Sequence, residues 1–144
     1  MLTAGYAVIE VDGGCWPNPG GPGSWAWIAS AGGIEIARDS GTLPAGADAS
    51  NNASEYAAVL EALAWIFGRH DVLSAQIVTD SKMLHRQLTG RWRVRKGRYA
   101  EEAHRAMRLL KAVRRRDKIV TFRLVPRRMN ERADAAEKAA RNLS

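Results

Sequence analysis

The chain has 144 residues, of which 46% are hydrophobic and 26% are charged. This length fits a single domain over residues 1–144, and the composition excludes a wholly disordered chain. A single cysteine, Cys15, excludes a disulfide framework and a cysteine zinc site, and it favours a reducing, cytoplasmic location. The N-terminus has no basic stretch followed by a long apolar one, and no apolar run reaches a membrane span, so neither a signal peptide nor a membrane association is expected.

Positive charge is concentrated in one part of the chain. The net charge is +7, but residues 1–80 carry −7 and residues 81–128 carry +14. A basic stretch beside an acidic one indicates a polyanionic partner, such as nucleic acid, held next to a site that needs carboxylates. The alternative is an ordinary solvated surface of lysine and arginine.

The first part of the chain predicts three strands. Tyr6–Asp12 is rich in β-forming residues and precedes two glycines, which indicates a buried strand. Ser24–Ser30 and Ile34–Arg38 flank Ala31-Gly32-Gly33, the pattern of a hairpin with a glycine turn. Together these segments predict an antiparallel three-strand meander.

The remaining chain alternates between helical and strand patterns. Apolar residues at helical spacing predict helices at 52–68, 81–88, 99–113 and 130–142. Strands are predicted at Ala75–Asp80 and Lys118–Val125, and a basic connector, residues 91–98, joins the second and third helices. This order predicts an α/β fold, a mixed five-stranded sheet of the meander plus parallel strands, with helices on both faces.

Four carboxylates lie on elements that could converge. Asp12 and Asp80 end strands that a right-handed crossover would set side by side and parallel, and sites of open α/β sheets lie at such carboxyl ends. Glu55 is expected in the first turn of the crossover helix, and Asp134 in the first turn of the last helix. Clustered carboxylates repel one another unless a divalent cation is bound, so the set predicts Mg²⁺ or Mn²⁺.

Each of these carboxylates also has a purely structural explanation. Asp12 can belong to a turn, and Asn52–Glu55 resembles a helix capping box. Asp80 can cap the helix that follows it, and Asp134 can favour the positive end of its helix. These explanations account for the residues singly but not for their common placement at one edge.

Four motifs in this order resemble those of the type 1 ribonuclease H (RNase HI) family. They are Val11–Gly20, Asn51–Ala58, Val78–Ser81 and Asn130–Asp134, within a resemblance that runs from about Ala4 to Leu143. Each motif alone is weakly specific, whereas the ordered set is strongly so. The resemblance implies a ribonuclease H-like fold.

The resemblance also implies an activity, namely endonucleolytic hydrolysis of the RNA strand of an RNA–DNA hybrid that gives 5′-phosphate and 3′-hydroxyl ends. Asp12 would bridge two metal ions, and Glu55, Asp80 and Asp134 would complete their ligands. The ions would be Mg²⁺, with Mn²⁺ as the alternative. Metal-activated water would attack directly, with no covalent enzyme intermediate. We expect such a protein to act as a monomer on the hybrid duplex.

Substrate contacts carry over by position within the same resemblance. The backbone of Gly13, Gly14 and Cys15 would face the RNA, where small residues permit close approach. The side-chain amides of Asn18 and Asn51 would contact the nucleic acid, and formation of a turn or a helix cap is their structural alternative.

Three further residues are candidates for substrate binding. Lys82 stands where many members of the family have glutamine and suggests a phosphate contact. Trp92 either stacks on the DNA strand or packs in the core. The loop before the last helix, Val125–Met129, has no histidine and resembles the shorter Pro-Arg loop of a branch that includes archaeal members. Arg127 either takes over the role of the loop histidine near the departing phosphate, or that role is missing.

Two other functions remain open from the sequence. A nuclease of the same fold could act on DNA or on double-stranded RNA, because fold alone does not fix substrate. A non-catalytic, basic nucleic-acid-binding domain would account for the charge of residues 81–128. The four carboxylates argue against the binding domain, because a binder of polyanions gains nothing from clustering them.

Overall fold

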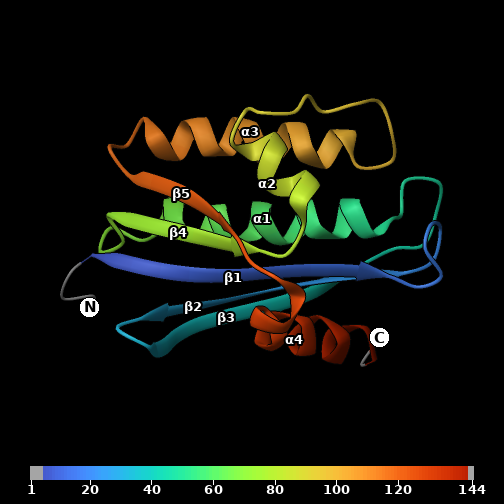
Figure 1. The fold of residues 1–144 in the computed structure, drawn as a ribbon, viewed down its shortest axis with the longest axis horizontal. Helices are drawn as coiled ribbons and strands as arrows, with labels where there is room; N and C mark the ends of the chain where they lie inside the picture. The colour runs from blue at the N-terminus through green and yellow to red at the C-terminus, as the bar shows by residue number, and fades with distance from the viewer. Residues whose placement is uncertain (1–4, 143–144) are drawn as a thin grey trace.

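A computed structural model describes residues 5–142, which form an α/β fold with one sheet between helices (Figure 1). The strands are β1 (Tyr6–Cys15), β2 (Gly23–Ala31), β3 (Ile34–Leu43), β4 (Ser74–Thr79) and β5 (Ile119–Leu124). The helices are α1 (Asn51–Gly68), α2 (Lys82–Leu88), α3 (Ala100–Arg114) and α4 (Glu131–Asn142), with a 3₁₀ turn at Arg127–Met129. Residues 1–4 and 143–144 lie outside the described range. The predictions that fall on them are the absence of a signal peptide at the N-terminus and the two ends of the family resemblance, Ala4 and Leu143.

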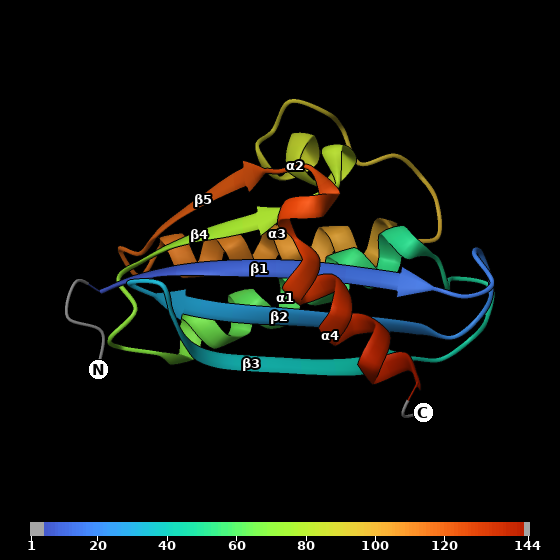
Figure 2. The same cartoon turned by 60° about the horizontal axis from the view of Figure 1, so that its bottom comes forward.

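The five strands form one mixed sheet in the order β3-β2-β1-β4-β5. β1, β2 and β3 pair antiparallel, whereas β4 pairs parallel with both β1 and β5. Helices α1 and α3 pack on one face of the sheet, and α4 crosses β1, β2 and β3 on the other (Figures 1 and 2). The predicted ribonuclease H-like fold, with its meander, parallel strands and helices on both faces, is confirmed.

Two strands, β1 and β3, run several residues further than the sequence predicts. β1 continues three residues past Asp12, because Gly13, Gly14 and Cys15 pair with the first residues of β2. β3 runs to Leu43, five residues beyond the predicted Arg38, because all of this segment pairs with β2. Hydrogen bonding to β2 thus extends β1 through Gly13 and Gly14, which the sequence pattern had placed at the end of the strand, and β3 through Gly41.

The core lies between the sheet and α1. The predicted helical stripe is confirmed, since Tyr56, Val59, Leu63 and Ile66 have no exposed surface. They pack on the buried side chains of β1 and β2, and α3 covers them from outside with small residues, Ala103 and Ala106. No helix within residues 5–142 is both long and apolar enough to cross a membrane.

Lys118 fixes the end of α1 against β5. Its buried ammonium group donates to the carbonyl oxygens of Ile66 and Val72, each at 2.8 Å, and to that of Arg69. A positive charge at the carboxyl end of a helix is favourable. The carbonyl oxygens of Ile66 and Arg69 each accept one backbone N–H as well, at 3.3 Å, whereas among the described residues that of Val72 has only Lys118 as a donor.

Lys118→Met is therefore expected to lower the free energy of unfolding by about 2–3 kcal/mol, because it removes three charge-assisted hydrogen bonds and leaves the Val72 carbonyl without a donor. Denaturant unfolding measures this loss. Lys111→Met, on the exposed face of α3, is the matched control and is expected to change stability by less than about 0.5 kcal/mol. Equal stabilities of the two variants would contradict this role of Lys118.

Candidate active site

Two aspartates lie side by side at the carboxyl end of the parallel strands β1 and β4. The parallel pairing of β1 with β4 ends at Glu10 and Val78, and Asp12 and Asp80 each come two residues later. They therefore emerge together at the carboxyl end of the parallel pair, as the sequence predicted. Asp80 does not cap α2, since Ser81 occupies that position and its hydroxyl accepts from the backbone N–H of Leu84 at 3.2 Å.

Glu55 reaches the same edge because β1 and α1 touch there. A Cβ atom on Gly13 would lie 2.3–2.4 Å from backbone atoms of Ser54 and Glu55, so only glycine permits this approach. The alternative explanation of Glu55 as part of a capping box is wrong: Ser50 caps α1, and its hydroxyl accepts from the backbone N–H of Ala53 at 3.0 Å. Glu55 consequently lies in the second turn of α1, not the first, and it has no capping role.

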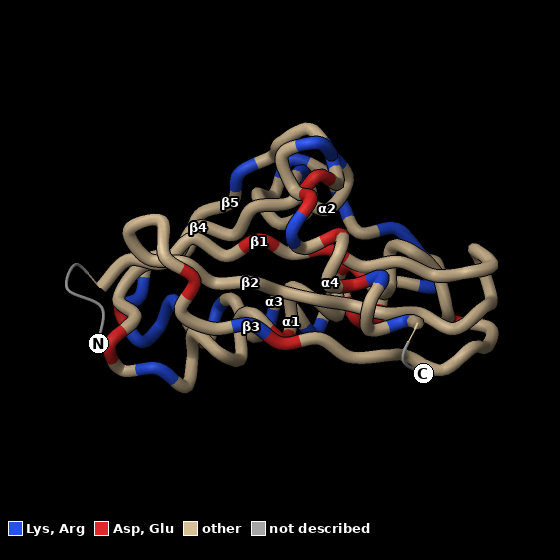
Figure 3. The backbone as a smooth tube through the Cα atoms, turned by 90° about the horizontal axis from the view of Figure 1, so that it is seen from below, with Lys and Arg blue, Asp and Glu red and all other residues tan. Residues whose placement is uncertain are grey.

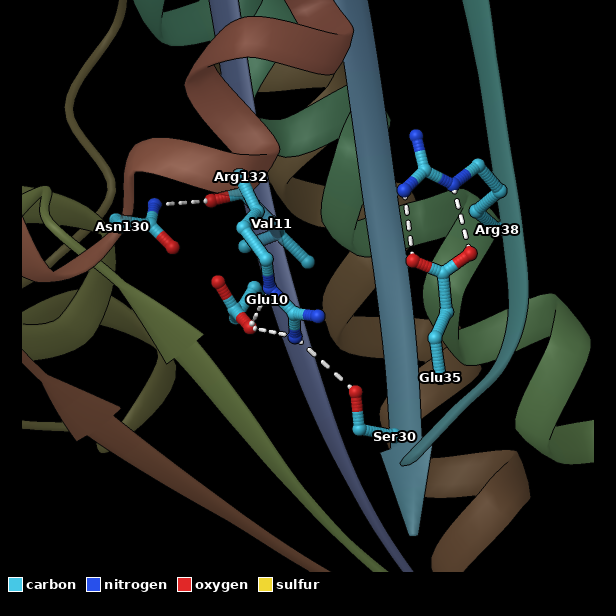
Figure 4. A network of polar contacts seen from close by, with 7 residues as sticks. All are labelled: Glu10, Val11, Ser30, Glu35, Arg38, Asn130 and Arg132. Atoms are coloured by element: carbon cyan, nitrogen blue, oxygen red, sulfur yellow. Dashed lines mark hydrogen bonds and ion pairs between the residues drawn. The ribbon is translucent and has the colours of Figure 1, made fainter. Parts of the chain in front are cut away.

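Two polar residues fix the start of α4 on the sheet (Figure 4). Asn130 donates from its amide nitrogen to the carbonyl oxygen of Val11 at 2.8 Å and to Asp80 at 3.4 Å. Arg132 forms an ion pair with Glu10 and donates to the Ser30 hydroxyl at 3.1 Å. These contacts tie α4 to β1 and β2 and place Asp134, in the first turn of α4, beside Asp12.

The acidic side chains form two groups that share Asp12. One contains Asp12, Glu55 and Asp80, and the other contains Asp12, Asp134 and Glu137. Within each group, one ligand oxygen per residue lies within 4.8 Å of those of the others. All four predicted carboxylates are therefore brought together, and each group has the oxygen ligands that a hard divalent cation prefers.

Glu137 is the member of this cluster that sequence reasoning missed. It is 2% exposed, accepts a hydrogen bond from the Ser24 hydroxyl at 3.0 Å, and has Arg141 at 3.7 Å. Its spacing of three residues from Asp134 places both carboxylates on one face of α4. That spacing was the available signal, but it does not reveal that β1 passes this face of the helix with a glycine, Gly14, against Glu137.

A cavity of about 240 Å³ lies over this cluster, lined by carboxylates and by basic side chains. Arg127, Lys138 and Arg141 share its wall with Asp12 and Glu55. Figure 3 shows acidic residues gathered where β1 runs beside α4, with lysine and arginine around α2 and the segment that follows it. The arrangement sets a negative centre inside a positive rim.

Burial and mutual repulsion make two of the carboxylates weak acids. Burial, together with the charges of Asp80 and Glu55, raises the pKa of Asp12 from 3.8 to about 8. Burial and the charge of Asp80 raise the pKa of Glu55 from 4.5 to about 8, although the nearby positive charge of Arg127 opposes this. The folded protein thus binds protons here more tightly than the unfolded chain does.

This tighter proton binding predicts a pH-dependent stability in the absence of divalent cations. The stabilisation is complete below about pH 4 and is lost as the pH rises through 8. Asp12→Asn is expected to match the parent near pH 4 and to exceed its free energy of unfolding by about 2 kcal/mol at pH 8.5. Thermal unfolding in a chelator measures the difference. If the stabilities of the two proteins changed with pH in parallel, Asp12 would not destabilise the folded chain at high pH.

Comparison with known proteins decides the family. A sequence profile of RNase H matches residues 5–142, which is nearly the whole chain. The chain belongs to the RNase H family. The predicted resemblance to the RNase HI family is thereby confirmed.

The chain is similar to ribonuclease H of a halophilic archaeon, both in sequence and in structure. The chain is 35% identical over 130 residues to ribonuclease HI of Halobacterium salinarum, covering 86% of this chain but only 58% of that protein. It matches the crystal structure of RNase H1 from that species with a TM-score of 0.81 at 30% identity, covering 96% of this chain and 99% of the other.

It also matches LC11-RNase H1, a protein isolated from compost by a metagenomic approach, in complex with an RNA/DNA hybrid. That match has a TM-score of 0.79 at 25% identity and covers 96% of this chain and 99% of the other.

The residues that the RNase H resemblance assigned to the RNA strand form a connected structure at the end of β1. Asn51 accepts from the backbone N–H of Cys15 at 2.7 Å, and Asn18 accepts from the backbone N–H of Asn51 at 3.0 Å. Both amide oxygens thus hold the loop to α1, while the structure gives their amide nitrogens no partner within residues 5–142. Cys15 is buried, with its thiol directed at the carbonyl oxygens of Pro17 and Gly21.

Gly13 and Gly14 have a structural reason to be glycine, since each allows close packing against α1 or α4. Contact of their backbone with RNA stays a prediction. The other RNase H substrate candidates, Lys82 and Trp92, lie together on α2 and the basic connector. The Lys82 ammonium is 5.9 Å from the centre of the Trp92 ring, which is 47% exposed and therefore not a core residue.

Proposed function

We propose that this protein is a ribonuclease H that hydrolyses the RNA strand of RNA–DNA hybrids endonucleolytically, leaving 5′-phosphate and 3′-hydroxyl ends. The observation that carries the proposal is the convergence of Asp12, Glu55, Asp80 and Asp134 at one edge of the sheet. Membership of the RNase H family and the likeness to an RNase H1 in complex with an RNA/DNA hybrid support it. Its site of action in the cell is proposed to be the cytoplasm.

The donor set fits divalent metal ions. Both carboxylate groups consist of oxygen ligands only, which favours Mg²⁺ or Mn²⁺ over zinc. Asp12, Glu55 and Asp80 would hold one ion, and Asp12 with Asp134 would hold a second, so that Asp12 serves both. Such ions, when bound, activate water and stabilise the leaving oxygen of a phosphodiester. A carboxylate cluster of this density also loses its mutual repulsion when a cation neutralises it.

Other side chains would bind and orient the hybrid. Arg127, beside Glu55 in the same cavity, is positioned to hold an anionic phosphate as the cleaved end departs. The amide nitrogens of Asn18 and Asn51 can donate to ribose 2′-hydroxyl groups, which distinguish RNA from DNA. Lys82 and Trp92 would contact the DNA strand across the duplex. We further propose that one chain acts alone on each duplex.

A cleavage assay with matched substrates tests the proposal. Labelled RNA–DNA hybrid, double-stranded RNA and double-stranded DNA of one sequence are incubated with the protein and Mg²⁺ or Mn²⁺. Cleavage confined to the RNA of the hybrid, with 5′-phosphate ends, is the expected result. Cleavage of DNA or of double-stranded RNA instead would establish a different nuclease of this fold. Binding of all three without cleavage would establish a non-catalytic domain.

The basic connector is expected to contribute affinity and little chemistry. Replacing Arg91, Arg93, Arg95 and Lys96 by Gln should weaken hybrid binding and reduce the slope of log K against log salt by about 2–3, because fewer counterions are released. Turnover at saturating hybrid should change by less than about threefold. Titrations at several salt concentrations measure the slope.

The matched control neutralises an equal number of charges on the exposed side of α3, at Arg105, Arg108, Lys111 and Arg115. Its salt slope is expected to remain close to that of the parent. If both variants lose the same slope, binding depends on overall charge, and the connector is not the duplex contact.

A further inference from the structure

A hydrogen-bond network joins α1 to the basic connector through one buried residue of α2, Gln87. The Tyr56 hydroxyl, on the residue next to Glu55, donates to the Gln87 side-chain oxygen at 2.7 Å. The Gln87 amide nitrogen donates to the backbone carbonyl oxygen of Arg93 at 3.1 Å and to the Tyr99 hydroxyl at 3.0 Å. The backbone N–H of Arg95 donates to the same Tyr99 hydroxyl at 3.3 Å.

The chemistry of these partners fixes the orientation of the Gln87 amide. A backbone carbonyl oxygen only accepts, so the group that faces Arg93 must be the NH₂ end. The oxygen end then faces the Tyr56 hydroxyl, which donates to it. Gln87 is 4% exposed and Tyr56 is fully buried, so water does not replace the bond between them without opening the structure, whereas the bonds from Gln87 to Arg93 and Tyr99 are partly buried.

The connector has few other attachments. Arg91, Arg93, Arg95 and Lys96 are exposed, whereas Val94 is partly buried and packs against the core. A cavity of about 800 Å³ is lined by residues of the connector together with Met83, Gln87 and Tyr99. Near its start, the backbone N–H of Trp92 donates to Arg86, and near its end Arg98 donates to the Ala47 carbonyl oxygen. Between these points, Arg93 and Arg95 are held by Gln87 and Tyr99.

We propose that Gln87 is a positioning residue that holds the basic connector, through Arg93 and Tyr99, in the one conformation that presents its arginines to the hybrid. The inference rests on the proposed function only in naming the hybrid as the ligand. Gln87 reaches no reacting atom. It acts on affinity by keeping the connector ordered before the nucleic acid arrives.

The expected effect follows from the population of the ordered connector. When a ligand binds only one of two conformations, its apparent dissociation constant equals the intrinsic constant divided by the fraction of protein in that conformation. If loss of the Gln87 bonds leaves the connector ordered about a tenth of the time, KM for the hybrid rises about tenfold. The value of kcat stays within about twofold, because the carboxylates are untouched.

Three substitutions separate this role from a general effect on the core. Gln87→Met keeps the size of the side chain and removes its bonds to Arg93 and Tyr99. Tyr99→Phe removes the hydroxyl that serves Gln87 and Arg95, while its ring still lies parallel to Tyr56 at 6.0 Å between centroids. Tyr56→Phe is the matched control, because it removes a buried bond to Gln87 but none to the connector.

Steady-state kinetics on the hybrid and limited trypsin digestion of the free protein provide two readouts. The connector contains five trypsin sites, and the cleavage rate of a local segment follows the fraction of time it is open. Gln87→Met and Tyr99→Phe should raise KM about tenfold and speed cleavage between residues 91 and 98 by a similar factor. Tyr56→Phe should change both by less than twofold.

Several outcomes overturn the proposal. Unchanged KM and unchanged trypsin cleavage in Gln87→Met would show that the connector orders itself. An equal rise in KM for Tyr56→Phe would assign the effect to the core and not to the connector. If the parent cleaves no hybrid, the proposed function fails, while the trypsin comparison still decides whether Gln87 orders the connector.

Discussion

Asp12→Asn, Glu55→Gln and Asp80→Asn are each expected to reduce cleavage of the hybrid by about a thousandfold or more while the chain stays folded. Each change removes one oxygen ligand from a group in which every carboxylate lies within 4.8 Å of its neighbours. Bound metal ions contribute several kcal/mol to catalysis of phosphodiester hydrolysis, and a thousandfold loss in rate corresponds to about 4 kcal/mol. Single-turnover cleavage at saturating hybrid measures the loss.

Asp134→Asn is expected to be milder, because Asp134 comes from the first turn of a helix and already forms an ion pair with Lys138 at 3.0 Å. The matched controls are carboxylates on the same helices that belong to neither group. Glu61→Gln on α1 and Glu131→Gln on α4 change exposed side chains, so their rates should stay within about twofold of the parent.

Two results would contradict this account. Turnover of Asp12→Asn near that of the parent would refute a mechanism that depends on the shared carboxylate. A large fall in melting temperature for metal-free Glu55→Gln would mean that Glu55 stabilises the helix. The structure argues against that second result, since Ser50 caps α1 and burial raises the pKa of Glu55.

The sequence predicted those site residues whose position depends on strand order. Asp12 and Asp80 each follow a hydrophobic strand, and the handedness of the crossover between these strands brings both to one edge. The approximate position of Asp134 followed from the start of an alanine-rich helix. The hydrophobic pattern and the expected topology were therefore enough to predict that these carboxylates converge.

Residues whose role depends on packing between distant elements were not accessible in this way. The sequence pattern predicted a helix from residue 52 and offered a capping box there as an alternative, but α1 begins at Asn51 and its cap is Ser50, so Glu55 lies in the second turn. Glu137 joins the site only because Gly14 lets β1 pass close to α4. Gln87 forms hydrogen bonds with Tyr56 on α1 and with Tyr99, the residue before α3. No local sequence pattern predicts such contacts.

Gly13 illustrates how a residue with no side chain can determine the geometry of the site. Gly13→Ala is expected to slow hybrid cleavage by about a hundredfold, because its Cβ atom would lie 2.3 Å from the Ser54 carbonyl carbon and 2.4 Å from the Glu55 nitrogen. These are backbone atoms of α1, so the strand and the helix must separate. A displacement of about 1 Å in a catalytic group can cost on the order of a hundredfold in rate.

The comparison with Gly14→Ala makes this prediction specific. A Cβ atom on Gly14 would meet the end of the Glu137 side chain at 2.1 Å, and a side chain can rotate away where a helix backbone cannot. We expect Gly14→Ala to lose tenfold or less in kcat, and Gly68→Ala, where nothing lies within 4 Å, to leave the melting temperature within about 2 °C of the parent. Gly13→Ala should instead lower both kcat and the melting temperature. Equal kcat values for the two β1 variants would mean that β1 and α1 can separate without moving Glu55 away from Asp12, and that close contact of the strand with the helix is not what assembles the carboxylates.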